Sequence, residues 1–165
     1  MATNVFFIQA TSAFIMVVSN ELLIQKAPNV SVLHTSMGMT APELAQSAFR
    51  AHVGTGVKAL IIVGTANGTV HKALFPLIRE TTERNVPIFV LSDNPSDDYG
   101  VKALKYEPQM KVADAGATPL RDVNIKKIAE VVQTIQAEIN QGKTGQQLNE
   151  AVIEKFGTPA LPAQN

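Results

Sequence analysis

The sequence predicts an α/β fold: a small parallel sheet with helices on both faces, in a three-layer arrangement of the Rossmann or flavodoxin type. Three short apolar runs of strand length lead to this prediction: NVSVLHT (29–35), VKALIIVG (57–64) and VPIFVLS (86–92). Stretches with helical spacing of apolar residues separate these runs, and strands that alternate with helices form parallel βαβ units. The middle run is apolar almost throughout, which is typical of a strand covered on both faces.

Composition limits the classes of protein that fit. The chain of 165 residues has the size of one domain; 45% of it is hydrophobic, 17% charged and 5% aromatic, as in aliphatic globular proteins. Lysine plus arginine equals aspartate plus glutamate, at 14 each, and no basic run occurs, so we expect no nucleic-acid partner. The chain has no cysteine, which excludes a disulfide framework, a thiolate nucleophile and a cysteine zinc site.

The first 28 residues are interpreted as an N-terminal extension. NVFFIQ and SAFIMVV predict a hairpin over residues 4–18, with a helix starting at about Ser12 as the alternative. No basic residue precedes the apolar part, and polar residues interrupt it, which fits neither a secretory signal nor a membrane helix. We therefore expect a cytoplasmic protein without a membrane segment.

Two helices are expected between the three strands. The first begins near Pro42, and the second follows the glycine-containing break at 64–69. The residues expected to face the core in the first helix are Leu44, Ala45, Ala48, Phe49 and Val53, and in the second Val70, Ala73, Leu74, Leu77 and Ile78.

After the third strand, residues 93–100 read as a polar loop and residues 111–119 as a short strand or extended connection. A long amphipathic helix is expected from Val123 until Gly142 ends it. A last helix follows over 145–157, and residues 157–165 are expected to form a loose tail. The core-facing residues of these two helices are expected to be Val123, Ile125, Ile128, Val132, Ile135 and Ile139, then Leu148, Val152 and Phe156.

Ligands of parallel α/β sheets bind beyond the carboxyl ends of the strands. Three loops leave those ends: HTSMGMT (34–40), GTANGT (64–69) and SDNPSDDYG (92–100). If they form a pocket, the residues just beyond the strands line it. The predicted ligand-binding residues are Ser36, Met37, Thr65, Asn67, Gly68 and Asp93.

Asn67, between Ala66 and Gly68, allows two interpretations of its role. In the first, Gly64 and Gly68 allow a tight turn and Asn67 adopts a positive φ or caps the following helix. In the second, Asn67 contacts a ligand. Its loop matches neither the dinucleotide fingerprint nor the lysine-containing phosphate loop. The loop at 34–40 follows the first core strand, as a flavodoxin-type phosphate loop does, but a flavin ring usually needs aromatic flanks, and both tyrosines lie downstream. The three histidines, His34, His52 and His71, do not have the spacing of a metal cluster. We therefore expect no cofactor and no metal.

The segment GVKALIIVGTANGTVHKALFPLIRETTERNVPIFVLSDNP resembles the C-terminal domain of the bacterial-type L-asparaginase/glutaminase family. That domain has a buried strand, a G-x-G-x-G-N style turn, a helix and then a G-x-P-V-V strand. Upstream, NVSVLHTSMGMTAPELAQSAF is similar to its first strand, loop and D-P-E-L helix. Downstream, ADAGATPLRDVNIKKIAEVV is similar to its G-V-I-P-A-G-D-M-T-P segment. The resemblance covers residues 29–156, which we interpret as one domain of this type.

The resemblance implies a module related to an amidohydrolase, with a small amino-acid-like ligand. Asn67 matches a residue that, in some family members, reaches the active site of a neighbouring subunit, and Glu107 lies in the region of its acidic partner. The family's nucleophile segments, T-G-G-T and T-D-T, do not occur here, so we expect no catalytic residue and no autonomous asparaginase or glutaminase activity. The alternative is a subunit or fragment that needs a separate N-terminal catalytic domain.

A stand-alone form of such a domain has an apolar interface to cover, so we expect a homo-oligomer, with residues 5–24 as the candidate contact.

Overall fold

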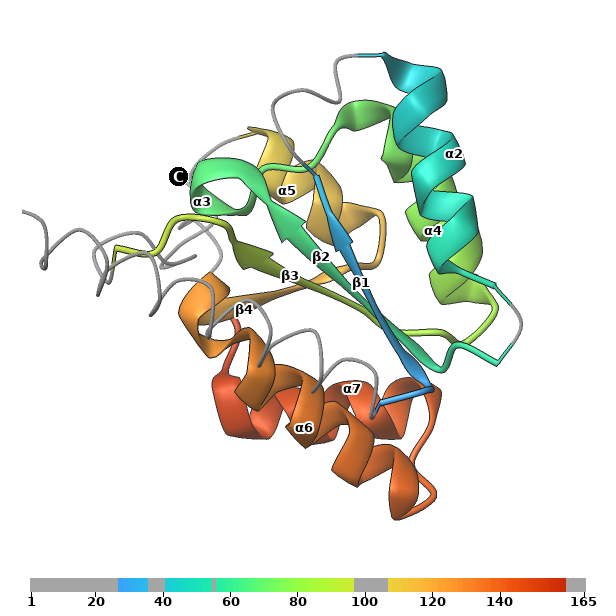
Figure 1. The fold of residues 1–165 in the computed structure, drawn as a ribbon, viewed down its shortest axis with the longest axis vertical. Coiled ribbons are helices and arrows are strands. Elements are labelled where there is room, and N and C mark those ends of the chain that lie inside the picture. Colours follow the sequence, from blue (N-terminus) through green and yellow to red (C-terminus); the bar gives the residue numbers. More distant parts are fainter. Residues whose placement is uncertain (1–26, 36–40, 55, 97–106, 160–165) are drawn as a thin grey trace, which may run out of the picture.

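A computed structural model of the chain describes residues 27–35, 41–54, 56–96 and 107–159. Its centre is a four-stranded sheet in the order β1-β2-β3-β4, and each neighbouring pair is parallel (Figure 1). The strands are β1 (Val30–His34), β2 (Ala59–Gly64), β3 (Ile88–Ser92) and β4 (Thr118–Asn124). The first three strands occupy the three predicted runs, which confirms those predictions.

Helices cover both faces of the sheet, so the predicted three-layer α/β fold is confirmed (Figure 1). On one face lie α2 (Pro42–His52), the short turn η1 (Lys72–Leu74), α4 (Phe75–Glu83) and α5 (Glu107–Asp114). On the other face, η2 (Ile125–Lys127) leads into α6 (Ile128–Asn140), and α7 (Gly145–Phe156) packs beside α6. The strands run in chain order, so the helices that link them share one face and the C-terminal pair covers the other.

β2 is the centre of the core, and all six of its residues are buried. Leu60 and Ile62 point toward α2 and α4, whereas Ile61 and Val63 point toward α6 and α7. This alternation is the period of two residues that a strand imposes on its side chains. A strand buried on both faces therefore has to be apolar at every position, as this one is.

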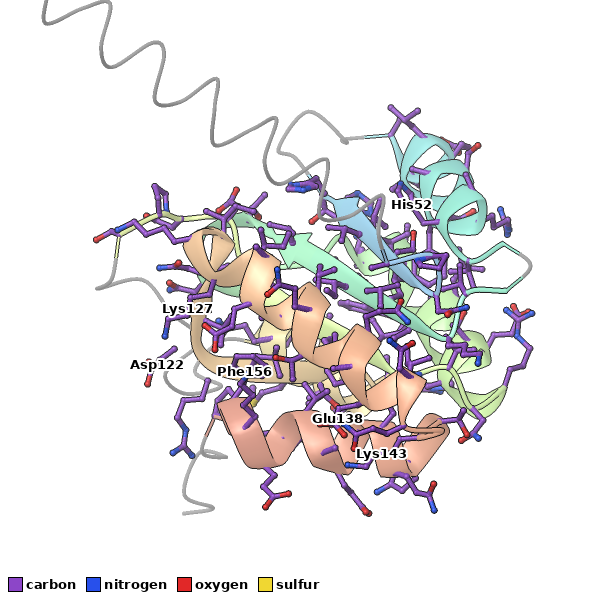
Figure 2. All side chains as sticks on the ribbon, turned by 60° about the horizontal axis from the view of Figure 1, so that its bottom comes forward. His52, Asp122, Lys127, Glu138, Lys143 and Phe156 are labelled. Atoms are coloured by element: carbon purple, nitrogen blue, oxygen red, sulfur yellow. The ribbon has the colours of Figure 1, made fainter. Side chains whose placement is uncertain are left out.

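An ion pair stabilises the turn between α6 and α7. Lys143 Nζ lies 2.5 Å from Glu138 Oε2, and Figure 2 shows the two side chains together at the turn. Gly142 adopts φ +88° just after α6, so the prediction that it ends this helix is confirmed.

Two predicted elements differ from the structure. Residues 111–119 are not one strand or connection: α5 occupies 107–114, and β4 starts at Thr118. The long helix starts at Ile128, because Val123 belongs to β4 and Ile125 to η2. The apolar pattern runs without a break from strand to helix, so the pattern alone could not show where one ends.

One residue of α2 was placed on the wrong face. Leu44 is 55% exposed, although we expected it to face the core. The helix buries Ala45 and Phe49 instead, which are four residues apart and therefore lie on one side.

The start of the predicted tail is docked rather than loose. The Arg121 amide donates to Gly157 O at 3.0 Å, and Arg121 Nε donates to Thr158 O at 2.8 Å. Pro159 is buried. Residues 157–159 therefore cover part of the outer edge of β4.

The predicted N-terminal hairpin, Ser36, Met37 and residues 160–165 lie outside the described residues. Within the described ranges, every helix is too short or too polar to cross a bilayer.

Candidate functional site

The loop after β2 is a closed turn at the carboxyl edge of the sheet. Thr65 and Thr69 form an antiparallel bridge, with each amide donating to the other's carbonyl oxygen at 2.9 Å. Between them, Ala66 has φ 50° and ψ −108°, and Asn67 has φ −88° and ψ 31°. These angles are close to those of a type II′ turn, whose first central position favours glycine.

Asn67 therefore does not have the conformation that we expected. Its φ is negative, and the positive φ values fall on Ala66 and on Gly68, at 83°. Nor does the Asn67 side chain cap a helix: the cap of the next helical turn is His71, whose Nδ1 accepts the Ala73 amide. A non-glycine residue in a sparsely populated conformation costs about 1–3 kcal/mol, so the neighbours of Ala66 have to hold it there.

Contacts from β3 and α5 hold the turn. The Asp93 carboxylate accepts the Ala66 amide at 2.7 Å, and the Ser92 hydroxyl donates to Ala66 O. The Gln109 side-chain amide donates to Asn67 O at 2.7 Å. The backbone groups around Ala66 and Asn67 are thus bound by side chains from two different elements, which fixes the turn relative to the sheet.

Gly64 has to lack a side chain for this turn to form. A Cβ at Gly64 would lie 2.6 Å from Gly68 C and 2.8 Å from Thr69 O. These are backbone atoms of the same turn, so they could move only if the turn opened. The φ of Gly64 is −87°, which any residue can adopt, so the requirement is for space alone.

The side chain of Asn67 is a polar group of the turn that the neighbouring elements do not bind. It is partly exposed, and it makes no hydrogen bond to any residue in the part of the chain that the structure describes. A carboxamide offers donors and an acceptor at one point. The turn therefore holds a fixed backbone and leaves this amide available at the edge.

The ends of β1 and β4 lie along the same edge. Thr35 is buried, and both its amide and its hydroxyl donate to Val63 O, at 3.0 and 2.9 Å. At the end of β4, Asn124 Nδ2 donates to Ser96 O at 3.2 Å, while Asn124 Oδ1 accepts the Lys126 amide at 3.0 Å. Buried polar groups thus terminate the described strand ends with their hydrogen bonds satisfied.

The surroundings of His34, the last residue of β1, lower its pKa from the ordinary histidine value. Burial is the largest cause of its lowered pKa, and the nearby His52 lowers it further, while Asp93 acts in the opposite direction. His34 is therefore a neutral imidazole at pH 7 on the Asp93 side of the edge.

Of the predicted site residues, Thr65, Asn67, Gly68 and Asp93 come together in and beside this turn. Ser36 and Met37 lie outside the described residues. Sequence reasoning missed Ser92 and Gln109, which hold the turn in place. Ser92 could have been noticed as a hydroxyl that ends an apolar strand, whereas Gln109 belongs to a helix that the sequence did not indicate.

Among its described residues, the edge shows neither a metal-site arrangement nor an activated Ser92 hydroxyl. The described residues contain no group of three or more histidine or acidic side chains that could hold a metal ion. The Ser92 hydroxyl donates to Ala66 O and accepts the Asn94 amide, so its proton and one lone pair are already used.

No protein-family model and no curated protein matches the sequence. The fold does match solved structures. L-asparaginase I from Vibrio cholerae O1 biovar eltor aligns with a TM-score of 0.59 and 17% identity over 75% of this chain and 35% of that one. The thermostable L-asparaginase from Thermococcus kodakarensis aligns with a TM-score of 0.56 and 20% identity over 81% of this chain and 38% of that one.

The chain thus spans little more than a third of the length of these enzymes. At such identity the similarity establishes the fold, which is shared with one part of an L-asparaginase.

Substitutions at Gly64 and at Ala66 are expected to change stability in opposite directions. Gly64→Ala should lower the free energy of unfolding by about 2–3 kcal/mol, because its methyl group overlaps backbone. Ala66→Gly should leave it unchanged or raise it by about 1 kcal/mol, because glycine relieves the positive φ. Urea unfolding measures both.

The control is Gly54→Ala, whose Cβ would have its nearest neighbour at 3.8 Å and should change little. Equal losses for Gly64→Ala and Gly54→Ala would contradict the described turn.

Proposed function

We propose that the chain is a non-catalytic module of the asparaginase C-domain type, formed by residues 29–156, that acts in the cytoplasm. It binds a small amino-acid-like molecule at the carboxyl edge of the sheet, or assembles there with a second copy or a partner. The observation that carries the proposal is the turn at 64–69: its backbone is fixed from two elements while the Asn67 amide stays unbonded among the described residues.

The chemistry of the edge suits a small zwitterion or amide. Asp93 is exposed, and one oxygen of its carboxylate accepts the Ala66 amide. The other oxygen can accept hydrogen bonds from an ammonium group. The Asn67 amide and the neutral His34 ring suit a carboxylate or a carboxamide. A ligand of this kind offers a positive group at one end and an acceptor at the other.

In the part of the chain that the structure describes, the Ser92 and Thr65 hydroxyls beside the turn are not activated, which supports a binding role rather than a catalytic one. Acyl transfer needs a nucleophile with a base beside it. Two of the hydroxyls in and beside the turn are engaged with carbonyl oxygens: Ser92 with Ala66 O, and Thr65 with Thr69 O at 3.4 Å.

A second candidate function is that of a subunit that completes another chain's amidohydrolase site. One observation favours it: α5 carries both Glu107 and Gln109, and Gln109 binds the backbone of Asn67. Glu107 therefore lies on the same helix as the residue that binds Asn67, two positions before it. The resemblance to the asparaginase family implies that Asn67 would reach a neighbouring subunit, with an acidic partner in the region of Glu107.

Asn67→Ala should separate binding from stability. Asn67 has a negative φ and no side-chain hydrogen bond to a described residue, so its replacement should change the free energy of unfolding by less than about 0.5 kcal/mol. Binding of L-asparagine, followed by amide shifts in a ¹⁵N NMR titration, should weaken severalfold, or the oligomer measured by light scattering should dissociate.

The matched control is Asn140→Ala, an exposed asparagine at the end of α6 on the other face. A parent protein that neither binds L-asparagine nor self-associates would contradict the proposal, as would an Asn67→Ala protein that matches the parent in both respects.

The chain alone should release no ammonia from asparagine or glutamine beyond a protein-free blank. The reason is that the nucleophile segments T-G-G-T and T-D-T do not occur in the sequence, and a coupled ammonia assay measures the release. Release that a substitution within this chain abolishes would disprove the non-catalytic role. Activity that appears only after addition of a separate chain with T-G-G-T and T-D-T segments, and that Asn67→Ala lowers, would support the second candidate.

A further inference from the structure

A cleft of about 430 Å³ lies between the chain that enters α4 and the start of α5. Residues 69–72 and Phe75 form one wall, and Glu107 and Lys111 form the other. Its volume falls in the range of about 300–1,000 Å³ that is usual for small-molecule sites. Two other cavities, of about 80 and 240 Å³, fall below that range.

The cleft combines an apolar interior with hydrogen-bond donors at its rim. Val70 and Phe75 supply the apolar surface. The tautomer of His71 is fixed, because Nδ1 accepts the Ala73 amide at 3.2 Å and the neutral ring must therefore carry its proton on Nε2. Nε2–H is thus a donor whose direction the start of α4 determines.

The charges of the cleft favour an anion. Lys111 forms an ion pair with Glu107, and this contact lowers the pKa of the Glu107 carboxyl, so that pair is neutral overall at pH 7. Lys72 has no ion pair with any residue in the described ranges. One positive charge and one imidazole donor are therefore left on the rim beside an aromatic ring.

We propose that this cleft binds a small organic anion with an apolar body, such as an aryl carboxylate. The ring or chain of the ligand packs on Phe75 and Val70, and its carboxylate accepts from Lys72 and from His71 Nε2. Burial of the apolar part supplies most of the binding free energy, and the charged rim sets the preference for an anion.

This site goes beyond the proposed function, because none of its lining residues belongs to the predicted ligand set at the carboxyl edge. The cleft and the site at the carboxyl edge share structural elements, however. Thr69 lines the cleft and also closes the turn that holds Asn67. The helix of Lys111 also carries Gln109, which binds Asn67 O. A ligand in the cleft therefore lies against one residue of that turn and against the helix that carries Gln109.

Phenylacetate, phenylacetamide and acetate test the proposal on the full chain. A ¹⁵N NMR titration at millimolar concentrations should show phenylacetate shifting the amides of residues 69–75 and 107–111. Phenylacetamide lacks the charge and acetate lacks the ring, so each should bind severalfold more weakly. Lys72→Gln should weaken phenylacetate binding about two- to fivefold, the range expected for one exposed ion pair.

The matched control is Lys127→Gln, an exposed lysine at the start of α6 on the other face, which should leave the affinity unchanged (Figure 2). Three results would overturn the proposal: no binding of phenylacetate, equal binding of phenylacetamide, or shifts that map to α6 and α7. Equal weakening by Lys72→Gln and Lys127→Gln would also overturn it, since the effect would then be one of net charge.

Discussion

The close approach of the turn at 64–69 to the end of β2 is the constraint on which the candidate site depends. Gly64 leaves no room for a Cβ, because the backbone of Gly68 and Thr69 fills that space. The chain must therefore fold back on itself immediately after the central strand. That reversal places Ala66 at a positive φ, a strained conformation for a residue with a side chain.

The neighbouring elements offset this strain with hydrogen bonds. Asp93 and Ser92 come from the strand beside β2, and Gln109 comes from α5. A neutral hydrogen bond contributes about 0.5–1.5 kcal/mol, so the part-buried bonds from Ser92 and Gln109 together are comparable with the strain. The backbone of the turn is therefore fixed relative to the sheet. The Asn67 side chain has no hydrogen-bond partner among the described residues, so its amide can bind another molecule.

The sequence predicted the part of this structure that apolar periodicity controls. The runs at 57–64 and 86–92 became strands that are buried on both faces, and the run at 29–35 became the edge strand β1, which is only partly buried. The boundary between β4 and α6 was missed, because Val123 and Ile125 continue an apolar pattern that both elements can use. Sequence reasoning located this turn correctly, but it assigned the positive φ to Asn67 instead of Ala66. Glycine and asparagine tolerate that conformation best, whereas here Asp93 and Ser92 impose it on Ala66.

Amide hydrogen exchange at Ala66 tests most directly whether the turn is held in this way. Ala66 is exposed, so without a partner its amide would exchange at the rate of an unstructured peptide. Bound to the Asp93 carboxylate, it should exchange much more slowly in the native protein, and Asp93→Ala should remove that protection. Exchange of the Ala66 amide at the unprotected rate in the parent protein would contradict a turn fixed from β3, and with it the preorganised Asn67 site.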